Sequence, residues 1–361
     1  MEVLVLNTSF EVIYLLDSFE SLIWTDRFNK YGDFEIYLPA SKKMLEILKP
    51  DYYLFNKDSE HLMIIEDIRL QSDSEDGNHL TVSGRSLESI IGRRIIWDQT
   101  NLSGNFQNGI KTLINDAIIN PSDESRKISN FLFVDSEDED ITSLELEAQY
   151  TGENLYNIVS ENSIDKNIGF KIVLDDQNRF VFSFYTGEDR SFNQIENPFV
   201  VFSPNFENII NSDYKDIRTE YCNVTLVAGE GEGTERTTTV VGTETGLTRR
   251  EIFTDARDLS SNTDEGTLTP EQYEEKLQQR GKENLKEYKI DQTFEGEVDT
   301  TQMFLYKRDF FMGDIVELEN EYGMQSRSRI VEIIFSQDEE GYSVYPTFEI
   351  VDEEEEGGDN S

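Results

Sequence analysis

The sequence predicts an α+β fold, mainly β, in which two β-rich units flank a small α+β unit. Three observations predict it. Short runs of alternating apolar and polar residues, separated by turn residues, fill residues 1–98 and are typical of a barrel or sandwich. Apolar residues at helical spacing appear within residues 99–195. Alternation then returns over residues 196–351, so three domains with these bounds are expected.

The first unit is expected to be built almost entirely of strands. Alternate side chains in residues 31–39 are apolar, so one face of this strand is expected to be buried. One short helix is expected over residues 86–93, with Ser86 as its cap. The remaining strands are expected at residues 3–6, 12–16, 21–24, 52–55, 62–68 and 80–83.

The middle unit is expected to combine two helices with a hairpin. Apolar residues from Phe106 to Ile118 recur at helical spacing, and Pro121 follows the run. A second helix is expected after a cap at Thr151. A turn at residues 175–178 separates two strands that are rich in apolar residues, which predicts a hairpin. Its strands carry Phe170, Ile172, Leu174, Phe180, Phe182 and Phe184.

The last unit is expected to be β-rich with one inserted helix. Thr269, Pro270 and Gln272 have the spacing of a capping box with proline at the first helical position, so a helix is expected over residues 270–288. The acidic residues 352–361 are expected to form a disordered tail. Strands are expected at residues 200–202, 223–228, 237–241, 251–254, 292–298, 315–318, 329–336 and 343–350.

Net charge is the strongest signal in the composition. The chain has 32 basic and 74 acidic residues, which give a net charge of −42. Such a surface repels DNA phosphates, so a protein that binds nucleic acid through basic contacts is not expected. The simplest interpretation of the charge is solubility. A second interpretation, a ring through which DNA slides without adhering, stays open.

No membrane or secretory segment is apparent in the sequence. The chain contains no apolar run long enough to span a membrane. Its first residues lack the basic segment, apolar stretch and cleavage site of a secretory signal. Synthesis in a cytoplasm is therefore expected.

Residues that support catalysis are scarce. The chain has one cysteine, Cys222, in a strand-like stretch where a buried apolar role is expected. Its two histidines, His61 and His79, are too few and too far apart to suggest a metal site. With 74 acidic residues, paired carboxylates carry no information about glycoside hydrolysis. We therefore expect no catalytic, cofactor-binding or metal-binding residues.

Three loops have some features of ligand sites. Residues 229–233 alternate glycine with glutamate, but the glutamates would repel phosphate, so a flexible hairpin tip is favoured. The acidic loops 135–140 and 73–79 have the oxygen density that calcium prefers without the spacing of an EF-hand. They are expected to be solvated, and calcium binding stays open.

The two tryptophans could stack on sugars of a receptor. Trp24 lies in an alternating strand, where burial in the core is favoured. Trp97 lies near a domain boundary, where half-burial at an interface is favoured.

Several stretches together resemble the tail hub proteins of long-tailed, non-contractile phages, which are often called minor tail proteins. These proteins are similar in fold to the baseplate hub of contractile phages. The resemblance covers about residues 20 to 350 and depends on the order and spacing of its parts. The matching stretches are LIWTDRF (22–28), GDFEIYLP (32–39), GRSLESIIGRR (84–94), NVTLVAGEG (223–231), RREIFTDAR (249–257) and MGDIV (312–316).

The resemblance implies a structural protein of the virion tail tip, not an enzyme, with no cofactor. It implies a homotrimer in which each chain supplies two tube-like β-barrel domains, so that three chains present a pseudo-sixfold ring to the hexameric tail tube. The implied partners are the tail tube or distal tail protein, the tape-measure protein, distal tip or fibre proteins, and DNA only in transit through the channel.

Two other functions stay open at this point. One is a tail-associated hydrolase of the cell wall, and the other is a receptor-binding adhesin of the tail tip. Some relatives carry C-terminal peptidase, lytic or fibre modules. Because the resemblance ends near residue 350, no such module is expected here.

Overall fold

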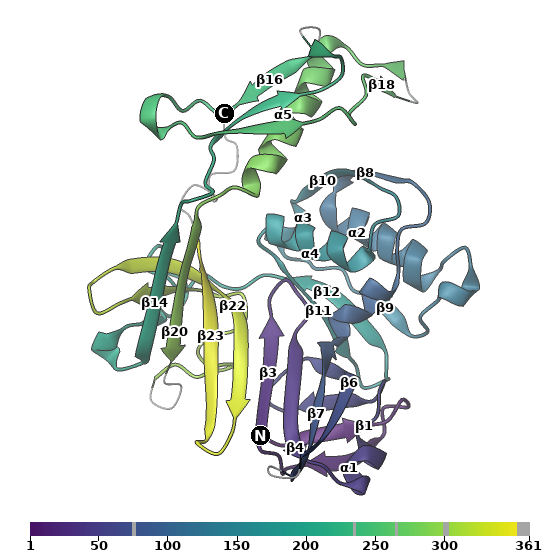
Figure 1. Cartoon of the computed structure of the whole chain (residues 1–361), viewed down its shortest axis with the longest axis vertical. Helices are drawn as coiled ribbons and strands as arrows, with labels where there is room; N and C mark the ends of the chain where they lie inside the picture. The colour runs from purple at the N-terminus through teal and green to yellow at the C-terminus, as the bar shows by residue number, and fades with distance from the viewer. Residues whose placement is uncertain (74–76, 234–235, 264–265, 299–302, 352–361) are drawn as a thin grey trace. The chain divides into compact units, whose positions relative to one another are not determined.

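The computed structural model describes residues 1–73, 77–233, 236–263, 266–298 and 303–351 (Figure 1). Packing contacts divide the chain into two units. Unit 1 comprises Met1–Asp213 and Phe294–Ser361, and unit 2 comprises Tyr214–Thr293, which is inserted into the sequence of unit 1. The expected tail at 352–361 and part of the acidic loop 73–79 lie outside the described residues. The expected three-part division at residues 98 and 195 stays a prediction.

A 13-stranded sheet dominates the described part of the chain. Its strand order is β14-β20-β23-β22-β3-β4-β7-β6-β5-β1-β2, with β21 paired to β22 and β13 paired to β21. The strands of the N-terminal region are β1 (Val3–Leu6), β2 (Val12–Leu16), β3 (Ser21–Arg27), β4 (Asp33–Pro39), β5 (Tyr53–Asn56), β6 (Leu62–Asp73) and β7 (Gly77–Ser86). The others are β13 (Val201–Phe202), β14 (Ile209–Ile217), β20 (Asp291–Val298), β21 (Ile315–Glu319), β22 (Gln325–Gln337) and β23 (Tyr342–Ile350).

The N-terminal and C-terminal β regions share this one sheet. Strand β3 pairs with β4 on one side and with β22 on the other, so Trp24 lies opposite both Phe34 and Phe335. The chain is mainly β, as the sequence predicts. None of the described sheets closes into a barrel, however, and no two-barrel arrangement is apparent within one chain. Alternation predicts that a segment is a strand, but it does not predict which strand becomes its neighbour.

Short helices follow the N-terminal strands. Helix α1 (Lys42–Ile47) begins after Ser41, whose side chain accepts a hydrogen bond from the backbone N–H of Met44. The helix expected over 86–93 is the 3-10 helix η1 (Leu87–Arg93). Ser86 occupies the N-cap position, as expected, but its hydroxyl makes no capping hydrogen bond and instead accepts one from the Gly32 N–H at 2.8 Å. The expected helix and its N-cap residue are therefore both present, and the helix is held at this end without the side-chain bond.

The middle region packs its helices against a three-stranded sheet. Phenylalanines fill this core because the hairpin has the expected register, with Phe170 opposite Phe184 and Ile172 opposite Phe182. Strand β9 adds to the sheet in parallel with β12. The elements are β8 (Thr100–Asn105), α2 (Phe106–Ile114), the π-helical turn η2 (Asn115–Ile119), η3 (Glu124–Arg126), β9 (Phe131–Phe133), α3 (Glu139–Thr142), β10 (Glu145–Tyr150), α4 (Leu155–Asp165), β11 (Gly169–Leu174) and β12 (Phe180–Tyr185).

The second helix of this region begins later than expected. Helix α4 is capped by Asn154, whose side-chain oxygen accepts hydrogen bonds from the N–H groups of Tyr156 and Asn157. The expected cap at Thr151 is therefore wrong. Asparagine and threonine are both good caps, and the packing of Leu155 into the core decides between the two sites.

Unit 2 is a small sheet with one helix on a face. Strand β15 lies between β16 and β17, antiparallel to the first and parallel to the second. Helix α5 has the expected capping box at Thr269 and ends at Lys286, close to the expected end. Its core residues Tyr273 and Leu277 cluster with Val227. The elements are β15 (Val224–Ala228), β16 (Thr238–Val241), η6 (Gly246–Thr248), β17 (Glu251–Asp255), β18 (Asn262–Thr263), β19 (Gly266–Thr267) and α5 (Pro270–Lys286). The 3-10 helix η4 (Pro204–Phe206) belongs to unit 1.

Candidate functional site

The structure separates most of the residues that the sequence singles out. Cys222 is only partly buried and lies before β15, which begins at Val224, so the expectation of a buried residue within a strand is wrong. His79 lies on β7, where it stacks on Tyr37 and approaches Glu20, with 3.3 Å between His79 Nε2 and Glu20 Oε1. His61 is buried elsewhere in the sheet region.

The loops with features of ligand sites have structural partners. Residues 229–233 lie in the connection of the β15–β16 hairpin, as expected, and the Glu230 carboxylate accepts hydrogen bonds from the N–H and hydroxyl of Ser261. In the loop 135–140, Asp138 caps α3 and Asp135 pairs with Lys111. Among the described residues, no group of three or more His, Cys, Asp or Glu side chains is placed to hold a metal ion.

Trp24 leads to a buried polar network that the sequence did not reveal. Its side chain is fully buried, as expected, and its indole N–H donates to Asp26 Oδ1 at 3.0 Å. Asp26 also accepts the hydroxyl of Ser59 at 2.7 Å. His61 Nδ1 lies 2.9 Å from Glu88 Oε1, and the same carboxylate oxygen accepts the N–H of Ile172 at 2.7 Å. We call Asp26, Ser59, His61 and Glu88 the buried charge network.

Four segments that are distant in sequence meet at this network. Asp26 lies on β3, Ser59 and His61 lie between β5 and β6, and Glu88 lies on η1. Through the N–H of Ile172, Glu88 also binds β11 of the middle region. Because a buried polar group is costly when it lacks a partner, each bond of this network favours one arrangement of these segments.

The ionisation of the network is set by burial and by mutual attraction. Burial raises the pKa of Asp26, although His61, Ser59 and Trp24 favour its charged form. Burial opposes the charged form of His61, but Glu88 and Asp26 outweigh it and raise the pKa of His61 to about 9. For Glu88, burial is outweighed mainly by His61, so the pKa of Glu88 is lowered. At neutral pH the network therefore holds an imidazolium beside the Glu88 carboxylate.

This arrangement suits the joining of strands and a helix within the fold better than it suits catalysis. Asp26, His61 and Glu88 are exposed by 1%, 5% and 0%, so solvent and an external substrate have almost no access to them. A general acid or base must come within hydrogen-bond reach of its substrate. What the geometry provides is a set of directed bonds between strands and a helix.

A close-packed aromatic junction lies near the network. The ring of Phe28 is fully buried, and its backbone carbonyl accepts the N–H of Phe170 at 3.1 Å. A Cβ atom at Gly169 or at Gly313 would come within 2.5 Å of the Phe28 ring. Gly313 also has a φ of +90°, which side-chain-bearing residues rarely adopt. We call Phe28, Gly169 and Gly313 the Phe28 junction; it joins the N-terminal strands, β11 and the turn before β21.

A second ionic cluster attaches the chain after β12 to the C-terminal strands. Asp314 Oδ2 accepts Arg190 Nε at 2.7 Å, and Asp314 Oδ1 accepts the N–H of Glu188 at 2.8 Å. Arg327 binds Asp189 at 2.7 Å. Burial raises the pKa of Asp314 despite these donors. The motif at 312–316 thus supplies both Gly313 of the Phe28 junction and Asp314 of this cluster.

The sequence carried only weak signals for these residues. Glu88 stands within the apolar run from Leu87 to Ile91, and a charge there is a sign of a buried partner. Gly169 begins an apolar strand, and glycine in a strand often marks a close approach of the backbone. In a chain with 74 acidic residues, however, no single carboxylate stands out before its neighbours are known.

The fold is similar to those of three solved phage tail proteins. Prophage tail protein gp18 from Listeria monocytogenes EGD-e is 13% identical, with 96% of this chain and 94% of that chain covered and a TM-score of 0.54. The tail protein from Neisseria meningitidis MC58 is 14% identical, with coverages of 96% and 95% and a TM-score of 0.56. The 43 kDa tail protein of prophage MuSo2 from Shewanella oneidensis is 11% identical, with coverages of 97% and 98% and a TM-score of 0.59. At these identities the likeness concerns the fold alone.

The sequence also matches a protein family over nearly its whole length. Among curated proteins, none matches the chain. In the described part of the chain, no helix has the length and apolar character needed to cross a membrane. The match to the siphovirus ReqiPepy6 Gp37-like proteins extends over residues 2–348 and confirms the resemblance to phage tail proteins. The chain therefore belongs to the siphovirus ReqiPepy6 Gp37-like protein family.

Proposed function

We propose that this protein is a structural, non-enzymatic subunit of the phage tail tip, where three copies form a hub. The hub joins the tail tube or distal tail protein to distal tip or fibre proteins. It surrounds the channel through which the tape-measure protein and DNA leave. Membership of a phage tail protein family and the similarity of the fold to phage tail proteins support this proposal.

The observation that carries the trimer is the open edge of the large sheet at β2. This strand is the last in the sheet, and among the described strands it pairs only with β1. Three of its apolar side chains are exposed: Val12 by 57%, Ile13 by 43% and Leu15 by 42%. An exposed apolar edge strand is a template for pairing with another chain. A closed ring of copies covers such edges on every copy at once.

The tube-like β units belong to the same proposal. A sheet that stays open within one chain can continue across a neighbouring copy and curve around the channel. The domain division at residues 98 and 195 and the two tube-like domains per chain are then features of the assembled ring. The net charge of −42 suits a channel, because an acidic wall attracts no DNA phosphate.

The decisive test is an image of the tail. We expect threefold density for this chain directly beneath the tail tube. Sixfold density, or a peripheral position, would contradict the hub. Cell-wall clearing by the purified protein, which persists through purification, would contradict the non-enzymatic part of the proposal.

A variant tests the role of the β2 edge. We expect Ile13→Lys to fold but to be incorporated poorly into tails, because a lysine on an edge strand opposes pairing with another chain. Ile23→Lys is the matched control, since Ile23 is 46% exposed on β3 and is paired with Ser336 on one side and Glu35 on the other. The measurement is the amount of this chain in purified tails. Equal incorporation of both variants would exclude β2 as the interface.

A further inference from the structure

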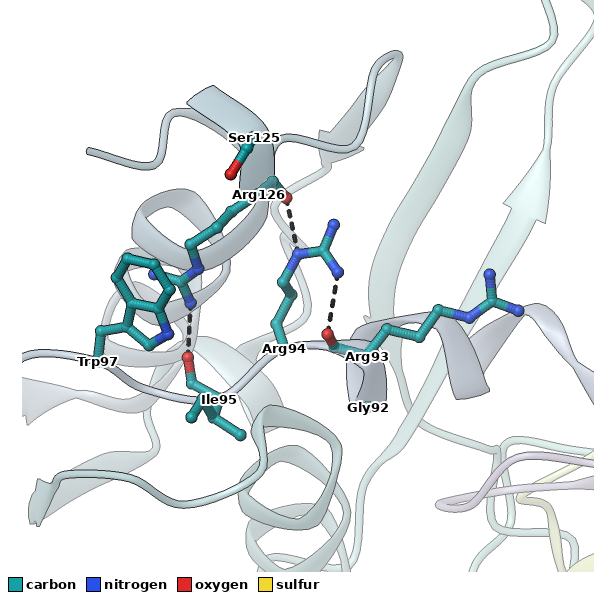
Figure 2. Close-up of a pocket in the computed structure, with 7 residues that line it drawn as sticks. All are labelled: Gly92, Arg93, Arg94, Ile95, Trp97, Ser125 and Arg126. Atoms are coloured by element: carbon teal, nitrogen blue, oxygen red, sulfur yellow. Dashed lines mark hydrogen bonds between the residues drawn. The ribbon is translucent and has the colours of Figure 1, made fainter. Parts of the chain in front are cut away.

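An open pocket on unit 1 contains three arginines and a tryptophan. It has a volume of about 270 Å³ and lies where the end of η1 meets the short helix η3 (Figure 2). Arg93, Arg94 and Trp97 line it from the segment that follows η1, and Ser125 and Arg126 line it from η3. We call it the arginine pocket. In a protein with a net charge of −42, such a concentration of positive charge needs an explanation.

Backbone carbonyls hold two of the arginines in place. Arg126 Nη2 donates to the carbonyl of Ile95 at 2.6 Å, and its guanidinium lies over the Trp97 ring at 4.1 Å from the ring centre. Arg94 Nε donates to the carbonyl of Arg126 at 2.7 Å, and Arg94 Nη1 donates to the carbonyl of Arg93 at 2.9 Å. Figure 2 shows the indole of Trp97 beside the Arg126 side chain. The guanidinium groups of Arg94 and Arg126 are therefore ordered before any anion binds.

These arginines have no carboxylate partner within the described part of the chain. Arg27, Arg85 and Arg190, by contrast, each form an ion pair. Burial, together with the positive charges of Arg126 and Arg93, lowers the pKa of Arg94.

The acidic side chain of Asp123, close to Arg126, is already engaged. Asp123 accepts the N–H of Ser125 at 2.9 Å as the cap of η3. Its pKa is lowered mainly by Ser125 and only to a small extent by Arg126. The arginine pocket thus keeps an excess of positive charge that a ligand with several carboxylates would neutralise.

We propose that the arginine pocket binds a carboxylate-rich peptide segment, and that its occupant is residues 352–361 of a neighbouring copy. This rests on the proposed homotrimer, which would bring three pockets and three such segments into one assembly. Guanidinium groups bind carboxylates with two parallel hydrogen bonds, and the exposed Trp97 ring offers a surface for the methylenes of glutamate. The acidic residues of the segment are Asp352, Glu353, Glu354, Glu355, Glu356 and Asp359.

Two considerations favour this occupant over a free polyanion. The acidic surface of the protein repels DNA and other large polyanions from solution. A segment attached to a neighbouring copy meets the pocket at a high effective concentration and needs no high intrinsic affinity. Ten residues can extend by up to about 33 Å, so the segment has a long reach beyond residue 351.

Trp97 makes binding directly measurable. The chain has two tryptophans, and Trp24 is fully buried whereas Trp97 is 52% exposed. Changes in tryptophan emission on binding therefore report on the pocket. The protein for the titration is the full chain with asparagine and glutamine at residues 352–356, which removes competition from its own segment. The probe is a synthetic peptide with the sequence of residues 352–361.

We expect a saturable change in Trp97 emission that weakens as salt is added, because ion pairs at a surface are screened. The same peptide with asparagine and glutamine in place of its acids should give no change. In the Arg93→Gln/Arg94→Gln variant, peptide affinity should fall by about tenfold or more if each lost charge-assisted bond contributes its usual share. Lys42→Gln/Lys43→Gln, which removes two exposed charges on α1, should bind as the parent does.

Two results would overturn the inference: no saturable change, or equal affinity in the Arg93→Gln/Arg94→Gln and Lys42→Gln/Lys43→Gln variants. Inorganic phosphate that competes as strongly as the peptide, charge for charge, would also overturn it, since the pocket would then bind any anion. The titration does not depend on trimer formation. A peptide that binds while tails show no threefold density therefore refutes the hub and leaves the pocket assignment standing.

Discussion

The buried charge network and the arginine pocket use charge in opposite ways within unit 1. In the network, Glu88 faces His61 at 2.9 Å, and both are almost fully buried. In the pocket, Arg94 lies near Arg126 and Arg93, and burial together with their positive charges lowers the pKa of Arg94. In the first arrangement Glu88 and His61 are paired with each other within the chain. The second is incomplete among the described residues.

This contrast separates charges that hold the fold from charges that await a ligand. A paired charge in the core is costly to disturb, because the remaining partner is left buried and unpaired. Like charges at the surface cost little while solvent screens them, and they gain when an anion arrives. The two sites should therefore respond very differently to substitution, to pH and to salt.

The largest expected effect is from Glu88→Ala. The substitution leaves the His61 cation and the N–H of Ile172 buried without their partner, and we expect a loss of about 3–5 kcal/mol in the free energy of unfolding. Urea denaturation measures it. Glu88→Gln is the control, because its amide oxygen still accepts from Ile172 and its loss should be clearly smaller. Equal losses would show that shape, not hydrogen bonding, matters at this position.

The second effect is a dependence of stability on pH. The folded pKa of His61, about 9, lies above the ordinary value of 6.5. Its contribution is therefore fully present below pH 6.5 and is lost as the pH rises through 9. We expect the free energy of unfolding to fall by a few kcal/mol between pH 6.5 and 10. In His61→Gln this fall should be much smaller, and an unchanged fall would show that other groups cause it.

The third effect concerns the Phe28 junction. In Gly313→Ala the new methyl group would meet the Phe28 ring at a residue whose φ is +90°, so we expect a loss of about 1–3 kcal/mol from overpacking alone. Gly323→Ala is the matched control, since Gly323 has a φ of +75° and no atom within 4 Å of the new methyl. Thermal unfolding of both variants separates the steric cost from the backbone cost. Similar losses of unfolding free energy in the two variants would show that contact with the Phe28 ring adds no cost.

The smallest expected effect is from Arg93→Gln/Arg94→Gln. These side chains form no ion pair in the described part of the chain, and the variant loses mainly the bond from Arg94 to the Arg126 carbonyl, so we expect the free energy of unfolding to fall by no more than about 1 kcal/mol. The same variant should lose affinity for the acidic peptide. A large loss of stability would instead show that these arginines stabilise the fold. The arginine pocket and the buried charge network would then have the same role.

Local structure was largely predictable from local sequence. The hairpin with Phe170 opposite Phe184 and the capping box at Thr269 both follow from spacing within a few residues. The cap of α4 was wrong, because Thr151 and Asn154 are both suitable caps and only packing distinguishes them. Helix α1 was not expected, since its side chains show no buried stripe that periodicity could detect.

The sequence by itself determined that the protein is mainly β, that its charge is strongly negative and that it resembles phage tail proteins. These depend on composition, on alternation and on the order of short motifs. Only the tertiary structure decided that β3 pairs with β22 in one open sheet and that Glu88 faces His61. It also decided that Arg94 and Arg126 lie together, with no carboxylate partner among the residues that the structure describes. Such contacts join residues far apart in the chain, and the patterns used to read a sequence extend over only a few residues.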